Sequence, residues 1–327
     1  MSKLKVLLTI AIFTIVLVGC LIYLTNHKDS TRIKMDKTSL RLKWINQSQF
    51  AGYYMANKNN HYKEASLDVS IEPAGPNISP IQLVTSGVNE FGVTGADQIL
   101  EARSKGVPIV AIAVFYRENP EALVSLKEKN IINPKDLENK KIAVIYGNDE
   151  NAYRLFLDKE GVDLTKIKEI SAIPGVSQLL TGDVDAKMAY EMNDPVLLKL
   201  EGREVNVIRF RDSNIKFYAD TLFTTEKMIQ EHPEKVEKFV NASIAGWNDA
   251  IRNPVEATKE VIRVNPSLKY EHQLGYLKGS IPLITQSGKI GLSDKKVWES
   301  MLGILVDKGI AKDNLDINAV FTNRFIK

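Results

Sequence analysis

The sequence predicts an α/β fold, and three observations support this prediction. From Leu40 onward, short apolar segments of strand length alternate with longer amphipathic segments of helical period. Capping residues, prolines and glycines mark the ends of several of the helical segments. The chain of 327 residues is long enough for one large domain or for two lobes.

Nine short apolar segments bounded by polar or turn residues are the predicted strands. They are residues 40–44, 67–72, 90–93, 107–115, 123–126, 141–145, 186–189, 205–209 and 219–224. Their order suggests two sets of βα units, with the chain crossing between the sets near residues 120 and 215. We therefore expect a first lobe of residues 39–120 and 216–327, an inserted second lobe of residues 121–215, and a hinge at the crossings.

Helices are predicted between these strands from their end signals. Asn77 or Ser79 is a suitable cap for a helix that starts at Pro80 and stops at Gly87, and residues 94–97 have the spacing of a capping box. Asn148 is a suitable cap for a helix closed by Gly161, and Pro233 and Pro254 suit first helical turns. Trp247 recurs at helical spacing with apolar neighbours, so we expect it in the core.

Composition excludes several classes of protein. The 43 Lys and Arg residues nearly balance the 40 Asp and Glu residues, so no basic surface for nucleic acid is expected. The four histidines are far apart in sequence and Cys20 is the only cysteine, so neither a Cys-based metal cluster nor an intrachain disulfide is expected. No cofactor is indicated.

The N-terminus has the pattern of an export signal. Lys3 and Lys5 precede an uncharged apolar run over residues 6–19, and the sequence LVGC ends this run at Cys20. This ending resembles the lipobox of bacterial lipoproteins. The resemblance implies an export signal at residues 1–19, lipidation at Cys20 and a tether formed by residues 20–38. Residues 21–24 extend the apolar run, so an uncleaved membrane anchor remains the alternative. Both interpretations place the remaining chain outside the cytoplasmic membrane.

Several motifs resemble those of one family. They are WINQSQFAGYY at residues 44–54, YKE and LDV at 62–64 and 67–69, GPNI at 75–78, VTSG and FGV at 84–87 and 91–93, and NPKDL at 133–137. Over residues 39–325 the chain resembles solute-binding proteins of ABC importers. The resemblance is greatest to the branch that binds thiamine pyrimidine precursors, which includes the fungal hydroxymethylpyrimidine synthases and is related to sulfonate, taurine and nitrate binders. It implies a two-lobed periplasmic-binding-protein type II fold and an ABC permease as partner.

Ligands of open α/β sheets bind beyond the carboxyl ends of the strands. The residues expected to contact ligand are in such loops or in the family motifs: Trp44, Asn46, Gln47, Tyr53, Asn77, Thr94, Asp97, Tyr116, Tyr146, Gly147, Asn148, Glu150, Tyr190 and Glu191. The aromatic members suit stacking on a flat ring, and the amides and carboxylates suit its polar edge. A Trp at a strand exit is too large for a simple turn, so Trp44 is the leading member.

Other roles remain open for some of these residues. Asn77, Asp97 and Asn148 also suit helix caps, Glu150 suits a solvated first turn, and Tyr116 or Tyr146 suits the surface of a lobe.

The charges of these loops favour a neutral or weakly basic ring. Arg117 is their only cation, whereas Asp97, Glu150 and Glu191 are anionic. The sequence therefore predicts a binding protein for a heterocycle such as a pyrimidine or a flavin. No heptad or edge signal suggests assembly, so a monomer is expected. A sulfonate, taurine or nitrate binder, a solute sensor and a pyrimidine-synthesising enzyme are the alternatives. The enzymes of the family resemble one another in a cysteine-rich motif that this chain lacks.

Overall fold

The computed structural model describes residues 13–14, 18, 35–75, 78–147, 150–286 and 288–327. The chain divides into two units, residues 1–36 and a second, compact unit of residues 37–327. Cys20 and most of the expected export signal and tether lie outside the described residues. Among the helices within the described ranges, none combines the length and the hydropathy that a membrane span requires.

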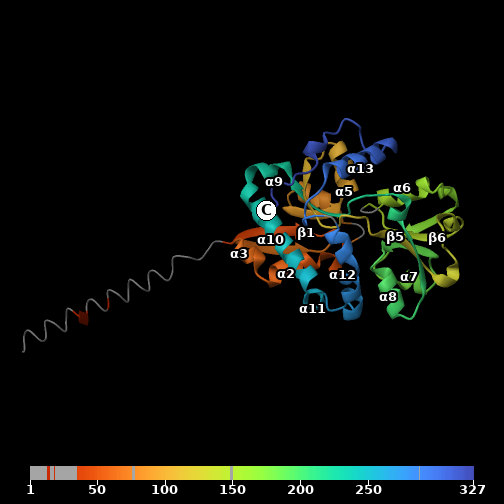
Figure 1. Ribbon diagram of the computed structural model, residues 1–327, viewed down its shortest axis with the longest axis horizontal. Coiled ribbons are helices and arrows are strands. Elements are labelled where there is room, and N and C mark those ends of the chain that lie inside the picture. Colours follow the sequence, from red (N-terminus) through yellow and green to blue (C-terminus); the bar gives the residue numbers. More distant parts are fainter. Residues whose placement is uncertain (1–12, 15–17, 19–34, 76–77, 148–149, 287) are drawn as a thin grey trace, which may run out of the picture. The chain divides into compact units, whose positions relative to one another are not determined.

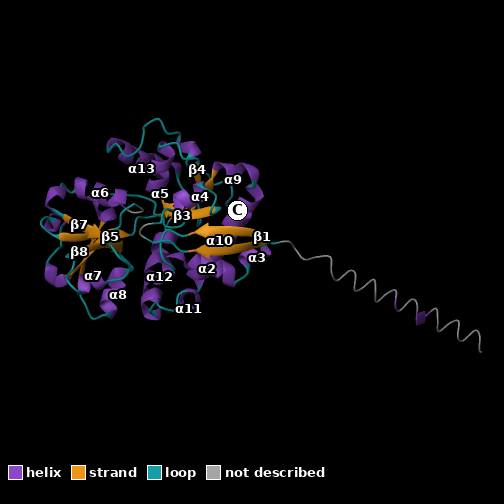
Figure 2. Ribbon diagram, turned by 180° about the vertical axis from the view of Figure 1, so that it is seen from behind, coloured by secondary structure: helices purple, strands orange, loops and turns teal. Residues whose placement is uncertain are grey.

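Two five-stranded sheets form the centre of the second unit, and Figure 2 shows them as separate groups of arrows. The first sheet has the order β2 (Leu67–Glu72), β1 (Asp36–Arg41), β3 (Phe91–Gly95), β10 (Asp220–Thr225) and β4 (Ile109–Val114). The second has the order β7 (Lys168–Ser171), β6 (Lys141–Val144), β8 (Ala186–Tyr190), β5 (Glu121–Leu126) and β9 (Val205–Arg209).

The two sheets repeat one topology. In the first sheet β10 is antiparallel to both of its neighbours, β3 and β4, and in the second sheet β5 is antiparallel to β8 and β9. Each antiparallel strand is the first one formed after the chain has crossed from the other sheet. When the other four strands of each sheet are numbered in chain order, both sheets have the order 2-1-3-n-4, where n is the strand that the chain forms on arriving from the other sheet.

The two crossing segments pair with each other. The N–H of Phe115 donates to the carbonyl of Asp220 at 3.0 Å, and the N–H of Ala219 donates to the carbonyl of Tyr116 at 2.9 Å. The expected lobe boundaries after residues 120 and 215 lie in these crossings. The exact residue bounds of the lobes stay a prediction, because residues 37–327 form one compact unit.

Helices cover the sheets (Figure 1), with α6 on one side of the second sheet and α7 and α8 on the other. The helices are α2 (Ala51–Lys58), α3 (His61–Glu64), α4 (Pro80–Thr85), α5 (Ala96–Ser104), α6 (Glu150–Lys159), α7 (Ser177–Leu180), α8 (Asp194–Leu200), α9 (Glu226–Glu231), α10 (Pro233–Arg252), α11 (Pro254–Val264), α12 (Tyr270–Thr285) and α13 (Lys295–Asp307). Short 3-10 turns occur at Ser48–Phe50, Lys127–Lys129, Pro134–Leu137, Leu164–Lys166, Phe210–Ser213 and Ile317–Ala319.

Most predicted helix ends are confirmed. Ser79 caps α4 by accepting from the N–H of Gln82, Pro233 and Pro254 begin α10 and α11, and Gly161 follows α6 with a left-handed φ of 65°. The expected capping box at residues 94–97 is wrong. The N-cap of α5 is Gly95, which has no side chain to accept a hydrogen bond.

Two strand predictions need correction. The first strand begins at Asp36, not at residue 40, and ends at Arg41, so Lys43 and Trp44 lie beyond the strand. The edge strand β7 has no counterpart among the predicted strands. Its sequence KEIS contains one apolar residue, so it lacks the short apolar segment from which the other strands were predicted.

The core position of Trp247 is confirmed. Its side chain is buried, and its ring centroid lies 5.4 Å from that of Phe115 and 5.9 Å from that of Tyr53. Trp247 packs where α10 meets α2, beneath the first crossing segment. This aromatic cluster supports the strand ends that carry the cavity described next.

Candidate functional site

A cavity of about 220 Å³ is lined by both halves of the second unit. The first sheet and its helices contribute Lys43, Trp44, Ile45, Gln47, Gln49, Ser267, Leu268, Lys269, His272 and Tyr276. The second sheet and its loops contribute Ile145, Pro174, Gly175, Lys187, Met188, Ala189, Tyr190, Asn193, Asp194 and Leu197. Most of these residues follow the carboxyl ends of β1, β6, β7 and β8, where the topology predicts a ligand site.

A buried polar cluster joins the two halves at one wall of the cavity. Lys43 and Asp220 are each 2% exposed, and Lys43 Nζ lies 3.6 Å from Asp220 Oδ1. The hydroxyl of Tyr190 donates to Asp220 Oδ1 at 2.8 Å and accepts from Lys43 Nζ at 3.0 Å. Gln49 Nε2 donates to Asp220 Oδ2 at 2.8 Å. Because buried charges are costly unless they are paired, this arrangement fixes Tyr190 relative to β1.

Trp44 lies where the chain leaves the first sheet. Its side chain is partly exposed, it lines the cavity, and its carbonyl accepts from the N–H of Ala74 at 3.0 Å. Gln47 also lines the cavity, and its Nε2 donates to Gln49 Oε1 at 2.8 Å. Asn46 is not among the lining residues, and its Oδ1 accepts from the hydroxyl of Tyr54 at 2.9 Å.

A second buried ion pair lies on the opposite sheet. Lys187 of β8 is 4% exposed and Asp194 at the start of α8 is 2% exposed, with 2.6 Å between Lys187 Nζ and Asp194 Oδ2. Lys187 Nζ also donates to the carbonyl of Gly175 at 2.7 Å. Sequence reasoning missed this pair and Lys43. The available signal was a lysine inside an otherwise apolar strand segment, AKMAY, which requires a buried partner.

Helix α12 forms a third wall, and a chain of hydrogen bonds connects it to both halves. Gln273 Oε1 accepts from the N–H of Ser48 at 2.7 Å, and Gln273 Nε2 lies 3.1 Å from His272 Nδ1. His272 Nε2 lies 3.1 Å from the carbonyl of Asn193. With the amide donating to Nδ1 and Nε2–H donating to the carbonyl, the neutral imidazole satisfies every contact. Burial accordingly lowers the pKa of His272 below 6.5.

Four of the predicted contact residues are buried and are not among those that line the cavity: Tyr53, Thr94, Asp97 and Tyr116. The ring of Tyr53 packs edge-on against Phe115 and Trp247. The Tyr116 ring lies 6.1 Å from that of Tyr190, directly behind the cavity wall. Burial raises the pKa values of the Tyr53 and Tyr116 hydroxyls, so both remain neutral. Tyr116 therefore supports the cavity wall from behind through Tyr190.

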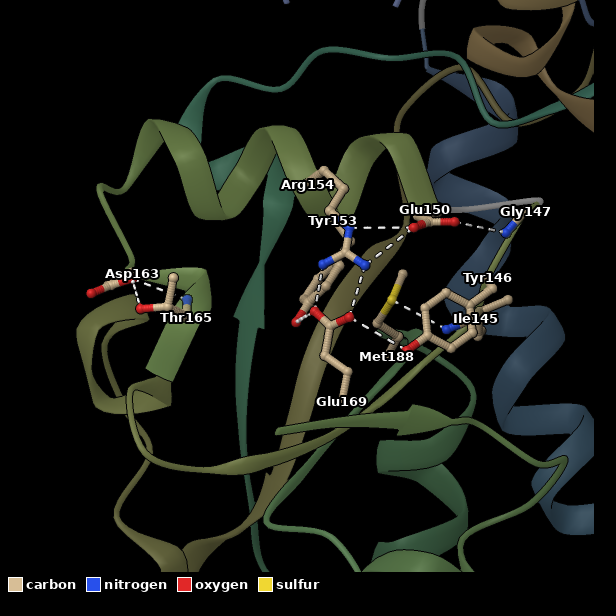
Figure 3. A network of polar contacts seen from close by, with 10 residues as sticks. All are labelled: Ile145, Tyr146, Gly147, Glu150, Tyr153, Arg154, Asp163, Thr165, Glu169 and Met188. Carbon is tan, nitrogen blue, oxygen red and sulfur yellow. Dashed lines mark hydrogen bonds and ion pairs between the residues drawn. The ribbon is translucent and has the colours of Figure 1, made fainter. Parts of the chain in front are cut away.

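Figure 3 shows that Tyr146, Gly147 and Glu150 belong to a separate polar network on the second sheet. The Arg154 guanidinium lies between two carboxylates, with Nη2 at 3.1 Å from Glu150 Oε1 and 2.7 Å from Glu169 Oε2. The Tyr146 hydroxyl donates to Glu169 at 3.4 Å, and Gly147 N–H donates to Glu150 at 3.3 Å. The Glu150 carboxylate, which we expected to contact the edge of a ligand ring, is thus already paired with Arg154.

The last predicted positions divide as follows. Tyr190 lines the cavity, whereas Glu191 pairs with Arg209 and Arg211. Asn77 and Asn148 lie outside the described residues. The described ranges contain no group of three or more His, Cys, Asp or Glu side chains arranged to hold a metal ion. The structure thus places Trp44, Gln47 and Tyr190 together at one cavity.

The sheet topology and this cavity define the class of protein. The chain has a two-lobed periplasmic-binding-protein type II fold. It is similar to the alkanesulfonate-binding protein SsuA from Xanthomonas axonopodis pv. citri bound to MOPS, with a TM-score of 0.68 and 14% identity over 88% of this chain and 98% of that chain. Residues 47–257 match the family model described as NMT1/THI5 like, and the chain belongs to this family.

Similar curated proteins cover most of the chain. The riboflavin-binding protein RibY of Chloroflexus aurantiacus is 27% identical over 89% of this chain and 86% of its own. The formylaminopyrimidine-binding protein of Halalkalibacterium halodurans is 23% identical over 83% of this chain and 85% of its own. A 4-amino-5-hydroxymethyl-2-methylpyrimidine phosphate synthase of Legionella pneumophila is 22% identical over 89% and 92%.

Proposed function

We propose that this chain is the extracytoplasmic solute-binding protein of an ABC importer and that it captures a small aromatic heterocycle for delivery to a membrane permease. The observation that carries the proposal is the wall of the cavity, which combines Trp44 and Tyr190 with two ion-paired lysines, Lys43 and Lys187. Aromatic faces suit stacking on a flat ring, and the polar groups suit its edge. Binding and release need no bond to be made or broken.

The size of the cavity favours a single ring. Its volume is about 220 Å³. Pockets for drug-sized ligands occupy about 300–1,000 Å³. A substituted pyrimidine therefore fits this conformation better than the three fused rings and side chain of a flavin. The relatives that are named for riboflavin and for formylaminopyrimidine support a heterocycle of one of these two kinds.

The charges around the cavity disfavour an oxyanion. Arg117 does not line the cavity, and its Nη1 donates to the carbonyl of Leu292 at 2.7 Å. Lys43, Lys187 and Lys269 do line it, which the charge argument from the loops alone overlooked. Each is already paired with a carboxylate, that of Asp220, Asp194 and Glu201 respectively, so none supplies excess positive charge for a sulfonate or nitrate.

Calorimetry on the full-length chain tests the proposal, with pyrimidines and flavins set against taurine and alkanesulfonates. We expect heat of binding from a pyrimidine and none from the sulfonates. Binding of sulfonates alone would overturn the heterocycle proposal. Formation of a pyrimidine phosphate by the chain would instead support the enzyme activity for which the Legionella relative is named.

We further propose that the chain acts as a monomer tethered to the membrane through lipid on Cys20. The sequence LVGC at residues 17–20 is the reason, with an uncleaved N-terminal anchor as the alternative. Metabolic labelling with a radioactive fatty acid tests this. Cys20→Ser should abolish labelling and processing, and unchanged processing and membrane attachment would favour the uncleaved anchor.

A further inference from the structure

We propose that Lys187 and Asp194 recognise the edge of a heterocycle in which a ring nitrogen lies next to a carbon that carries an amino group. In this arrangement Lys187 donates to the ring nitrogen and Asp194 accepts from the amino group. The inference rests on the proposed function, because it specifies the ligand class of the same cavity.

The ammonium group of Lys187 has a donor to spare. An ammonium has three N–H donors, and among the described residues Lys187 has two acceptors, the carbonyl of Gly175 at 2.7 Å and Asp194 Oδ2 at 2.6 Å. The side chain is 4% exposed and lines the cavity. A buried donor without an acceptor is costly, so an acceptor on the ligand would complete the group.

Asp194 supplies the neighbouring acceptor. Within the described part of the chain, its hydrogen bond is the one that Oδ2 accepts from Lys187, which leaves Oδ1 for a donor. Asp194 is 2% exposed and also lines the cavity. Because Lys187 and Asp194 contact each other, the cavity wall presents one donor and one acceptor side by side.

An aminopyrimidine edge complements this pair of groups. The ring nitrogen accepts and the amino group on the next carbon donates, so both buried protein groups gain partners at once. A 4-methoxy group in place of the 4-amino group presents an oxygen acceptor to Asp194, and two acceptors then face each other without a proton between them. The pair therefore discriminates between ligands of almost the same size.

Asp194→Asn should reverse this discrimination. The carbonyl oxygen of the new side chain is retained by the Lys187 ammonium, so the amide NH2 faces the cavity. A donor then meets the amino group of the ligand, whereas a methoxy oxygen gains a partner. A purely structural ion pair would instead weaken the binding of both ligands by the same factor.

A second ion pair in the chain provides a matched control. Lys235 Nζ also contacts a carbonyl, that of Lys37 at 2.7 Å, and a carboxylate, that of Glu90 at 2.7 Å. Lys235 is largely buried, and neither it nor Glu90 lines the cavity. Lys235→Met and Lys187→Met therefore both remove a buried ammonium and leave a carboxylate, but only Lys187→Met changes the cavity.

The test is calorimetric titration of the full-length chain and these variants with 4-amino-2-methylpyrimidine and with 4-methoxy-2-methylpyrimidine. We expect the wild-type protein to bind the amino compound at least tenfold more tightly, and Asp194→Asn to remove or reverse this preference. Lys187→Met should weaken binding of the amino compound at least tenfold, and Lys235→Met should leave it within about twofold.

Two results would overturn the inference and separate it from the proposed function. If Asp194→Asn weakens both compounds equally, or if the wild-type chain binds riboflavin but neither pyrimidine, the edge recognition is wrong and heterocycle binding stands. If no pyrimidine and no flavin binds to the wild-type chain, the proposed function and this inference fail together.

Discussion

Gly279 of α12 faces Met192 of the second lobe at a distance that leaves no room for a side chain. A Cβ atom at residue 279 would lie 2.7 Å from Met192 Cβ. One helical turn earlier, a Cβ at Gly275 would lie 2.7 Å from Val196 Cγ1. Residues four apart share a helix face, so these two glycines form a seam along which α12 and the segment of residues 192–196 approach closely. This seam adjoins the cavity.

Gly279→Ala should therefore weaken ligand binding by opposing the close approach of α12 to residues 192–196. Overpacking costs about 1–3 kcal/mol, which corresponds to a decrease in affinity of about 5-fold to 150-fold if the strain is relieved when the lobes separate. Small-angle scattering should show a larger radius of gyration, and calorimetry the loss of affinity. Gly303→Ala is the control, because Gly303 lies in α13 with no heavy atom within 4 Å of an added Cβ. Wild-type affinity in Gly279→Ala would contradict the role of the seam.

Trp44→Ala should reduce ligand affinity by about 30-fold or more while leaving the fold intact. Loss of a large aromatic at a binding site can cost about 2 kcal/mol or more, and Trp44 is partly exposed, so it contributes less to the core than Trp247. Calorimetry with a pyrimidine and a thermal melt measure both effects. Trp298→Phe, a change at a buried tryptophan that is not among the cavity residues, should leave affinity unchanged. A folded Trp44→Ala protein that binds as tightly as the wild type would exclude stacking on Trp44.

Gly246→Ala should destabilise the fold, because Gly246 of α10 packs directly against the backbone of α2. An added Cβ at residue 246 would lie 2.2 Å from the carbonyl oxygen of Gly52 and 2.5 Å from the backbone nitrogen of Ala56. Backbone atoms of a helix cannot move aside singly, so the two helices must separate and the cost should reach about 3 kcal/mol. Urea denaturation monitored by circular dichroism measures it. Gly303→Ala should stabilise slightly, by up to about 1 kcal/mol, through helix propensity.

The sequence was informative where the residue type and its neighbours in the chain determine the position in the fold. Short apolar segments located nine of the strands in the described part of the chain, and the size of Trp44 at a strand exit placed it at the cavity. It was less informative where tertiary partners decide. Nothing in the sequence around Glu191 indicates a partner. In the structure it pairs with Arg209 and Arg211, which follow α8 in the chain. Lys187 lies in strand β8 and Asp194 begins helix α8, seven residues later. No helix or strand period relates them, and the turn between β8 and α8 brings them into contact.

Acid should destabilise the protein through His272. Burial lowers the pKa of His272 below its usual value of 6.5, and the hydrogen bond to the Asn193 carbonyl and the nearby Asp194 only partly oppose this, while Lys269 reinforces it. The native state therefore binds fewer protons than the unfolded state at pH values between the native pKa and 6.5. The stability contributed by the neutral imidazole is complete above pH 6.5 and is lost as the pH falls through that window, with a slope of at most about 1.4 kcal/mol per pH unit.

Denaturation at several pH values between 8 and 5 checks this prediction with a pair of variants. His272→Gln removes the titrating group and keeps an amide that can donate to the Asn193 carbonyl, so its stability should fall less steeply with acid than that of the wild type. His232→Gln, at an exposed histidine, should follow the wild-type curve. Since the hydrogen bond from Gln273 requires an unprotonated Nδ1, protonation also breaks the chain that joins Ser48 to Asn193. Parallel curves for the wild type and His272→Gln would show that His272 remains free to take up a proton in the native state.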